Sequence, residues 1–274
     1  MPDLHADPFD ALPSGLPPGR LVVPDDDFTD GEWTGGAVLW VSDEPTPDAA
    51  RHWLRLFEIR DKTGLYPLLL ETLKGEPTRP WHDGELDVPA PVGSIDVLTA
   101  VGVLRRFWES VTEELPGDAG EDEQVDDSGV PRGPWPGLAP PGEPGRDPDA
   151  VAREYVQARY TGEKLLLGLV PAARGADTLA RTGWQGPANH TGDVQEISAV
   201  VRSWEDRFGA RVVAVGFATL DLSVAAPPAT ADQALGVAAE HHAFCPDNVW
   251  QNSDGFTEYA GRLIGAGNWS FWWD

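Results

Sequence analysis

Four large aromatic side chains lie within residues 269–274, the last six positions of the sequence. Side chains of this size remove large apolar areas from water when they are buried. We therefore expect these residues to form the final strand of the fold. Because successive side chains of a strand point to opposite faces of its sheet, Trp272 and Trp273 should diverge. One should fill the core, and the other should be exposed or covered by another part of the chain.

The composition is that of a globular protein with many turns. Of 274 residues, 41% are hydrophobic and 12 are tryptophan, which is enough for a sizeable core. The 30 glycines and 26 prolines indicate long connections rather than a helical bundle. No stretch approaches the roughly 20 apolar residues of a membrane span, and residues 1–5 show no signal-peptide pattern. With a single cysteine, Cys245, an internal disulfide is excluded. A cytoplasmic protein is expected.

The formal net charge of −25 bears on the class of partner. Binding to nucleic acids or to anionic membranes depends on Lys and Arg side chains that neutralise phosphates, so neither partner is expected. The same charge favours a basic protein partner through electrostatic steering. Solubility alone also accounts for an acidic surface, and the charge does not decide between the two explanations.

Residues 116–150 are predicted to be an acidic, Pro/Gly-rich linker. They hold eight Pro, seven Gly, nine acidic residues and two Arg. The acidic run at 121–127 repels itself and should be extended, whereas residues 135–138 can dock on a domain surface. The linker separates an N-terminal α/β region at 1–115 from a C-terminal domain at 151–274.

In the N-terminal region, apolar periodicity and breakers place the elements. We predict strands at 21–23, 37–41 and 65–70, and helices at 47–60 and 94–115. The apolar face of the last helix is expected to comprise Leu98, Val101, Leu104, Trp108 and Val111.

The C-terminal region alternates strands with helices. The clearest helix, at 193–208, carries Ile197, Val201, Trp204 and Phe208 on one face, while Glu205 and Asp206 are expected on its solvated surface. Two strands at 211–217 and 220–225 are close enough to form a hairpin. The other predictions are strands at 164–170 and 268–273 and helices at 149–160, capped by Asp149, at 177–181, after Thr230, and at 256–264.

These elements define an α+β fold with two α/β-type halves. Removing one helix from each crossover of the C-terminal half leaves the order β-α-β-β-α-β. That order is typical of a ferredoxin-like mixed sheet, here with extra helices.

Three segments of the C-terminal half, at 240–248, 259–263 and 269–274, resemble the domain-of-unknown-function 4253 family. Residues 203–209 and the pair Gly183-Trp184 are also similar to it. The family is common in actinobacteria, has a Trp-Trp pair near its C-terminus, and includes long members with an N-terminal half like this one. The resemblance implies a family 4253 domain at 151–274. It implies no catalytic residue, because the family has no established activity.

The densest polar cluster comprises His241, His242, Cys245 and Asp247. Imidazole, thiolate and carboxylate groups all bind metals, which makes His241, His242 and Cys245 candidate ligands, but a second paired motif is missing and we expect no metal. The catalytic candidates are His241, Cys245 and Asp247, with Cys245 as a nucleophile. We favour a third interpretation, in which Cys245-Pro246-Asp247-Asn248 forms a structural turn.

The sequence has no Gly-x-x-x-x-Gly-Lys phosphate loop, no Gly-x-Ser-x-Gly nucleophile elbow and no His-Glu-x-x-His motif, and no cofactor is expected. The candidate binding residues are Trp250, Trp272, Trp273, Asn189 and His190, because exposed aromatic residues and polar loops often contact partners. The predicted function is a non-enzymatic, acidic protein-interaction module, for instance an immunity-type or inhibitor protein directed at a basic partner. The alternatives are a hydrolase with a cleft near the His241–Asp247 cluster, rimmed by Asn189 and His190, and a small-ligand sensor.

Overall fold

The computed structural model describes residues 8–29, 31, 33–112, 125–126, 128–143, 145–251 and 255–274. Most of the predicted acidic run at 121–127 lies outside the described residues. Within the described residues, seven strands form one mixed sheet in the order β1-β2-β4-β3-β5-β6-β7. The strands are β1 (Gly19–Val22), β2 (Leu39–Ser42), β3 (Leu65–Leu70), β4 (Leu166–Pro171), β5 (Arg211–Val215), β6 (Thr219–Ser223) and β7 (Asn268–Trp272).

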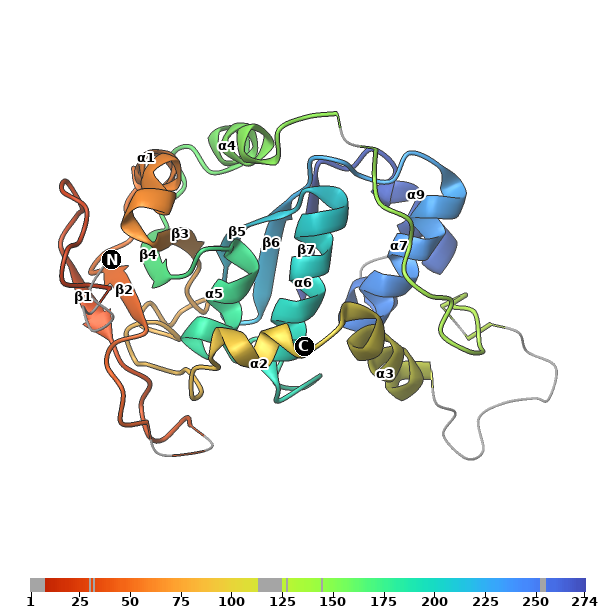
Figure 1. Cartoon of the computed structure of the whole chain (residues 1–274), viewed down its shortest axis with the longest axis horizontal. Coiled ribbons are helices and arrows are strands. Elements are labelled where there is room, and N and C mark those ends of the chain that lie inside the picture. The colour runs from red at the N-terminus through yellow and green to blue at the C-terminus, as the bar shows by residue number, and fades with distance from the viewer. Residues whose placement is uncertain are drawn as a thin grey trace.

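Helices connect these strands and pack on both faces of the sheet. Figure 1 shows α5 and α6 in front of the sheet, and α1 and α4 together along its upper edge. The helices are α1 (Ala49–Thr63), α2 (Val92–Asp96), α3 (Ala100–Thr112), α4 (Pro148–Arg159), α5 (Gly175–Thr182), α6 (Val194–Phe208), α7 (Ala231–Phe244), α8 (Asp247–Trp250) and α9 (Phe256–Leu263).

Strand β3 joins the two predicted halves. It pairs antiparallel with β4 and parallel with β5, and each of its six side chains is buried. The sequence of a strand that is covered on both faces is a continuous apolar run, as in Leu65-Tyr66-Pro67-Leu68-Leu69-Leu70. The α+β class is confirmed, with one sheet to which both halves contribute. A separate ferredoxin-like sheet is not seen, because β3 lies between β4 and β5. The domain boundaries at 115 and 150 stay predictions.

Strands β6 and β7 give the sheet two chemically different faces. Leu220 and Leu222 point to one face together with Trp269 and Phe271, whereas Asp221 points to the other. The first face is the core, because the Trp204 ring of α6 stacks on Phe271 with 5.3 Å between ring centroids. Helix α7 covers the same face through Phe244 and His241, and α2 and α3 pack outside α5, α6 and α7.

The terminal tryptophans diverge as predicted. Trp273 is 2% exposed and its indole N–H donates to the carbonyl oxygen of Phe244 at 3.2 Å. Trp272 is 36% exposed and lies on the opposite face of β7. The alternation of the strand therefore assigns one tryptophan to the core and the other to the surface.

The carboxylate of Glu240 is fully buried and joins three parts of the chain. It accepts hydrogen bonds from both Nη atoms of Arg207, from Trp204 Nε1 and from the backbone N–H of Ala139. Arg207 also donates to the carbonyl oxygen of Ala139 at 2.8 Å. The predicted docking of residues 135–138 is confirmed at Trp135, which packs against the core next to Trp108.

Two predictions about helices were wrong in detail. The helix expected at 94–115 is divided into α2 and α3, and Val97 between them is 81% exposed. Leu104 and Trp108 of the predicted apolar face are buried, but Val103 and Phe107 are buried beside them and Val101 is exposed.

The cap of α4 is Asp147, whose side chain accepts from the Asp149 N–H at 3.2 Å, rather than Asp149 itself. Pro148 fits the first turn of the helix and moves the cap one residue before it. The Asp149 carboxylate instead binds Arg60 of α1 and Arg211 of β5.

Replacing Trp273 by alanine should lower the free energy of unfolding by about 3–5 kcal/mol, because it leaves a large cavity in the core. The matched Trp272→Ala variant should lose less than about 1 kcal/mol, because that ring is partly in solvent. Urea denaturation of both variants measures the difference. Equal losses would contradict the assignment of the two faces.

Candidate binding site

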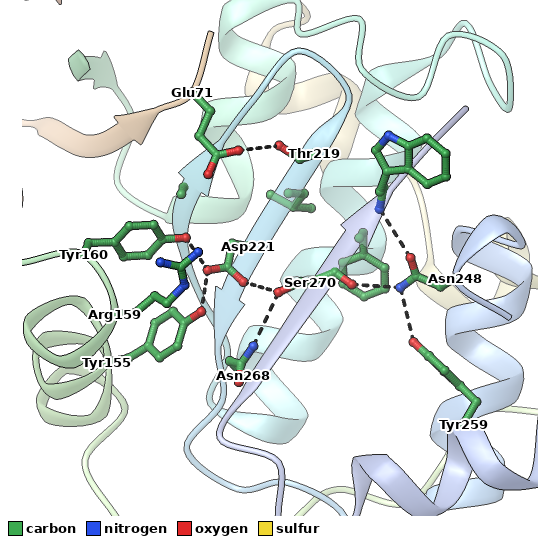
Figure 2. A pocket seen from close by; sticks show the side chains of 14 residues that line it. Glu71, Tyr155, Arg159, Tyr160, Thr219, Asp221, Asn248, Tyr259, Asn268 and Ser270 are labelled. Atoms are coloured by element: carbon green, nitrogen blue, oxygen red, sulfur yellow. Dashed lines mark hydrogen bonds between the residues drawn. The ribbon is translucent and has the colours of Figure 1, made fainter. Parts of the chain in front are cut away.

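A cavity of about 510 Å³ opens on the second face of the sheet, beyond the part that α4 covers. Its volume is within the range of small-ligand sites, about 300–1,000 Å³. The wall is built from the end of β3, from α4, β6 and β7, and from α8 and α9 (Figure 2). The lining residues are Glu71, Tyr155, Arg159, Tyr160, Ala214, Thr219, Leu220, Asp221, Asn248, Tyr259, Asn268, Ser270, Phe271 and Trp272.

Asp221 lies at the centre of this wall and is 9% exposed. The hydroxyl groups of Tyr155 and Tyr160 each donate to its Oδ2 atom at 2.5 Å, and the Ser270 hydroxyl donates to Oδ1. Burial, and then the charge of Asp221, raise the pKa of both tyrosines above the ordinary value. Both phenols therefore stay protonated and act as donors to the carboxylate.

The local sequence explains why these groups meet. In β6, Asp221 lies between two core leucines, so the alternation of the strand turns it to the second face. The register pairs Asp221 with Ser270 of β7. Helix α4 brings the two tyrosines over the sheet, and the bonds from Asp149 to Arg60 and Arg211 hold its first turn against α1 and β5.

Glu71 and Arg159 carry the other two charges of the cavity. Glu71 directly follows β3, is half-buried, and accepts a hydrogen bond from Thr219 Oγ1 at 3.1 Å. Arg159 ends α4, is exposed, and places its guanidinium 5.1 Å from the centroid of the Tyr160 ring. The lining therefore holds two carboxylates and one guanidinium.

Asn248 closes the side of the cavity at the outer edge of β7. Its amide nitrogen donates to the carbonyl oxygen of Ser270 at 2.8 Å, and its amide oxygen accepts from the Trp272 N–H at 3.3 Å. One side chain thus replaces a neighbouring strand at an edge that would otherwise present free backbone groups.

The predicted turn at residues 245–248 connects α7 with α8. The Asn248 N–H donates to the carbonyl oxygen of Cys245 at 3.2 Å, which closes the turn. Asp247 accepts from the Asp274 N–H at 3.2 Å, and Asn189 donates to the carbonyl oxygen of Asp274 at 2.6 Å. Two of the predicted site residues, Asp247 and Asn189, therefore bind the backbone that follows β7.

The remaining catalytic and metal candidates are in the core. His241, His242 and Cys245 are fully buried, and the thiol of Cys245 lies 3.0 Å from the carbonyl oxygen of Trp272. Burial raises the pKa of the Cys245 thiol to about 12. It lowers the pKa of His241 to about 3 and that of His242 to about 4. Within the described ranges, no three His, Cys, Asp or Glu side chains converge in a way that would hold a metal ion.

The predicted binding residues are divided among different places. Trp272 lines the cavity, and with Trp273 and Asn189 it also lines a second cavity of about 390 Å³. Trp250 is 47% exposed and packs on His242. His190 is half-buried against Phe107, and burial lowers its pKa. A role of these residues in binding stays a prediction.

Sequence reasoning did not identify Asp221, Glu71, Tyr155 and Tyr160. The available signal was a single carboxylate within the apolar pattern Leu220-Asp221-Leu222, since an inward or covered carboxylate in a strand requires partners. Those partners come from α4 and β7, about 50 to 65 residues away in the sequence. No local motif connects them.

The buried histidines should make the fold sensitive to acid. Both are neutral when folded, so the unfolded chain takes up protons first as the pH falls below 6.5, and stability is lost down to about pH 4. At pH 5 each histidine should lower the free energy of unfolding by about 2 kcal/mol relative to pH 7. Urea denaturation measures this free energy at both pH values, and in a His242→Gln variant the difference between them should be smaller by that amount. An unchanged difference would contradict the assignment.

The thiol of Cys245 should be unreactive in the native protein. A buried, protonated thiol reacts with Ellman's reagent at pH 8 only when the chain opens, so the native rate should be at least about 100-fold below that in denaturant. The absorbance of the released thiolate measures both rates. Fast labelling of the native protein would restore Cys245 as a candidate nucleophile.

Comparisons with known proteins address the C-terminal part of the chain. No curated protein matches the chain, and no solved structure matches it. Among the helices of the described residues, none has both the length and the apolar character that a bilayer crossing demands. Residues 166–274, which begin at β4 and end after β7, match the family described as Domain of unknown function (DUF4253). The chain therefore contains a DUF4253 domain at residues 166–274.

Proposed function

We propose that this protein is a non-enzymatic, acidic interaction module that binds a basic protein partner. The observation that carries the proposal is the cavity on the second sheet face, with the carboxylates of Glu71 and Asp221 in its wall and the half-exposed Trp272 beside them. A net charge of −25 would steer a basic partner toward the protein. An immunity-type or inhibitor-like role toward such a partner is the concrete form that we propose, in the cytoplasm.

The buried cluster at residues 241–247 gives less support to a hydrolase. A protonated thiol is a weak nucleophile, and Cys245 has its pKa raised to about 12. His241 donates to or accepts from the Tyr259 hydroxyl at 2.9 Å and has no exposed surface. A substrate therefore has no contact surface on these two side chains.

We also infer that the N-terminal part belongs to the functional unit, as in the long form of the family. The DUF4253 match begins at β4, yet β3 lies between β4 and β5. Residues 166–274 alone would leave β4 and β5 without the strand that pairs with both of them. In the whole chain that position is filled by β3.

An affinity experiment with defined salt tests the proposed function. The full chain is immobilised, proteins retained from a native lysate are identified, and the strongest binder is purified for Kd measurements at 50 and 300 mM salt. We expect a basic protein whose Kd rises at least about tenfold between the two conditions, because salt screens the attraction between the charged surfaces. Retained proteins of ordinary charge, or a Kd independent of salt, would refute the proposal.

Trp272 should contribute to this contact. The Trp272→Ala variant should weaken the partner about tenfold or more, because large aromatic side chains at the centre of an interface carry much of its affinity. Trp250→Ala provides the matched control, since Trp250 is also a half-exposed tryptophan but lies outside the cavity. If only Trp250→Ala weakens binding, the partner contacts the surface around Trp250 rather than the cavity.

A further inference from the structure

We propose that the cavity on the second sheet face binds one cationic group, an alkylammonium or a guanidinium. The inference rests on the proposed function, because a basic partner presents such groups on its lysine and arginine side chains. The cavity is the site that would receive one of these groups. Three independent features of the cavity support the proposal: an unpaired buried carboxylate, the direction of its hydrogen bonds, and the aromatic ring beside it.

Asp221 differs from the other buried carboxylates of the described residues. Five carboxylates are buried among the described residues, and four of them form an ion pair with an arginine. Asp221 has no Lys or Arg within ion-pair distance in the described part of the chain. A buried charge is costly unless it is paired. Asp221 is stabilised by neutral hydroxyl groups, which leave its charge in place. The paired carboxylates are Glu85 with Arg79, Asp177 with Arg202, Glu205 with Arg174 and Glu240 with Arg207.

Four hydroxyl protons of the wall are already used. Tyr155, Tyr160 and Ser270 each have one O–H, and each donates it to Asp221. Thr219 donates its proton to Glu71. The oxygens of Tyr155, Tyr160 and Thr219 offer lone pairs to the cavity, next to two carboxylates, whereas the Ser270 oxygen also accepts from Asn268 Nδ2 at 3.4 Å. A wall of acceptors is complementary to a ligand that carries several N–H donors and a positive charge.

The protein itself shows a guanidinium against this wall. Arg159 lies over the Tyr160 ring at 5.1 Å, a cation–π contact, and lines the same cavity. Its side chain is exposed, so it can turn into solvent when another cation enters. Arg159 thus competes with a ligand by charge repulsion and by occupying the ring. Removing it should strengthen binding, whereas removing a carboxylate should weaken it.

Small cations test the site directly on the full chain. The probes are n-butylammonium and N-methylguanidinium chloride, with n-butanol as the neutral isostere and sodium chloride at equal ionic strength. Binding is followed by NMR of the tryptophan indole N–H groups, since Trp272 lines the cavity. We expect saturable binding of both cations with a shift of the Trp272 signal, and no binding of butanol.

Three substitutions in the cavity should change the affinity for the cations, two of them in one direction and one in the other. Asp221→Asn and Glu71→Gln should each weaken the cations at least about tenfold, as expected for the loss of a charge-assisted contact. Arg159→Gln should strengthen them by a factor of a few. Glu58→Gln on the exposed surface of α1 changes the charge equally and should leave the Kd unchanged. If Asp221→Asn does not fold, Glu71→Gln decides, because among the described residues its carboxylate bonds only Thr219.

The outcomes separate this inference from the proposed function. Butanol binding as tightly as butylammonium, or equal Kd values for Glu71→Gln and Glu58→Gln, would overturn the cation site even if a basic partner binds with strong salt dependence. Cation binding without any basic partner would keep the site and refute the proposed function. Displacement of a bound partner by butylammonium identifies a partner side chain as the natural occupant. Simultaneous binding of both identifies a free small cation.

Discussion

The buried carboxylate of Glu240 fixes the arrangement on which the rest of the structure depends. It accepts four hydrogen bonds, from Arg207, Trp204 and Ala139, and an unpaired charge at this depth would cost several kcal/mol. Helices α6 and α7 can therefore approach each other in few ways. The hydrogen bond to its indole nitrogen orients the Trp204 ring, which then packs on Trp269 and Phe271 of β7. The position of β7, and with it one wall of the cavity, follows from this ionic contact in the core.

A buried carboxylate has different partners on the two faces of the sheet. On the core face, arginine neutralises Glu240 and the contact is complete. On the second face, Asp221 receives only hydroxyl donors, whose dipoles stabilise its charge without cancelling it. The tyrosines contribute in a second way, since their hydroxyl oxygens and rings both favour a cation. A carboxylate whose charge is stabilised but not neutralised by the protein is suited to binding a cationic ligand.

Local sequence patterns correctly predicted the elements that depend on neighbouring residues alone. The spacing of Ile197, Val201 and Trp204 predicted α6, and the alternation of residues 269–273 predicted that the terminal tryptophans diverge, although not which of the two is buried. The insertion of β3 between β4 and β5 is a pairing between residues about 100 to 145 apart, and no local pattern encodes it. Glu205 illustrates the same limit. We predicted it on a solvated surface, but Arg174, 31 residues away, pairs with it in a buried position.

The candidate site was missed for the same reason, because its residues lie on both sides of residue 166, where the DUF4253 match begins. Asp221, Ser270 and Trp272 lie inside the DUF4253 match, whereas Glu71, Tyr155 and Tyr160 precede it. The matched segment thus supplies the central carboxylate and the edge strand. The preceding part supplies the second carboxylate, both tyrosine donors and Arg159. A DUF4253 domain without an equivalent of β3 and α4 would have an exposed acid on an open sheet, which water and salt would screen. The proposed recognition of a cation at this position therefore depends on the whole chain rather than on the domain alone.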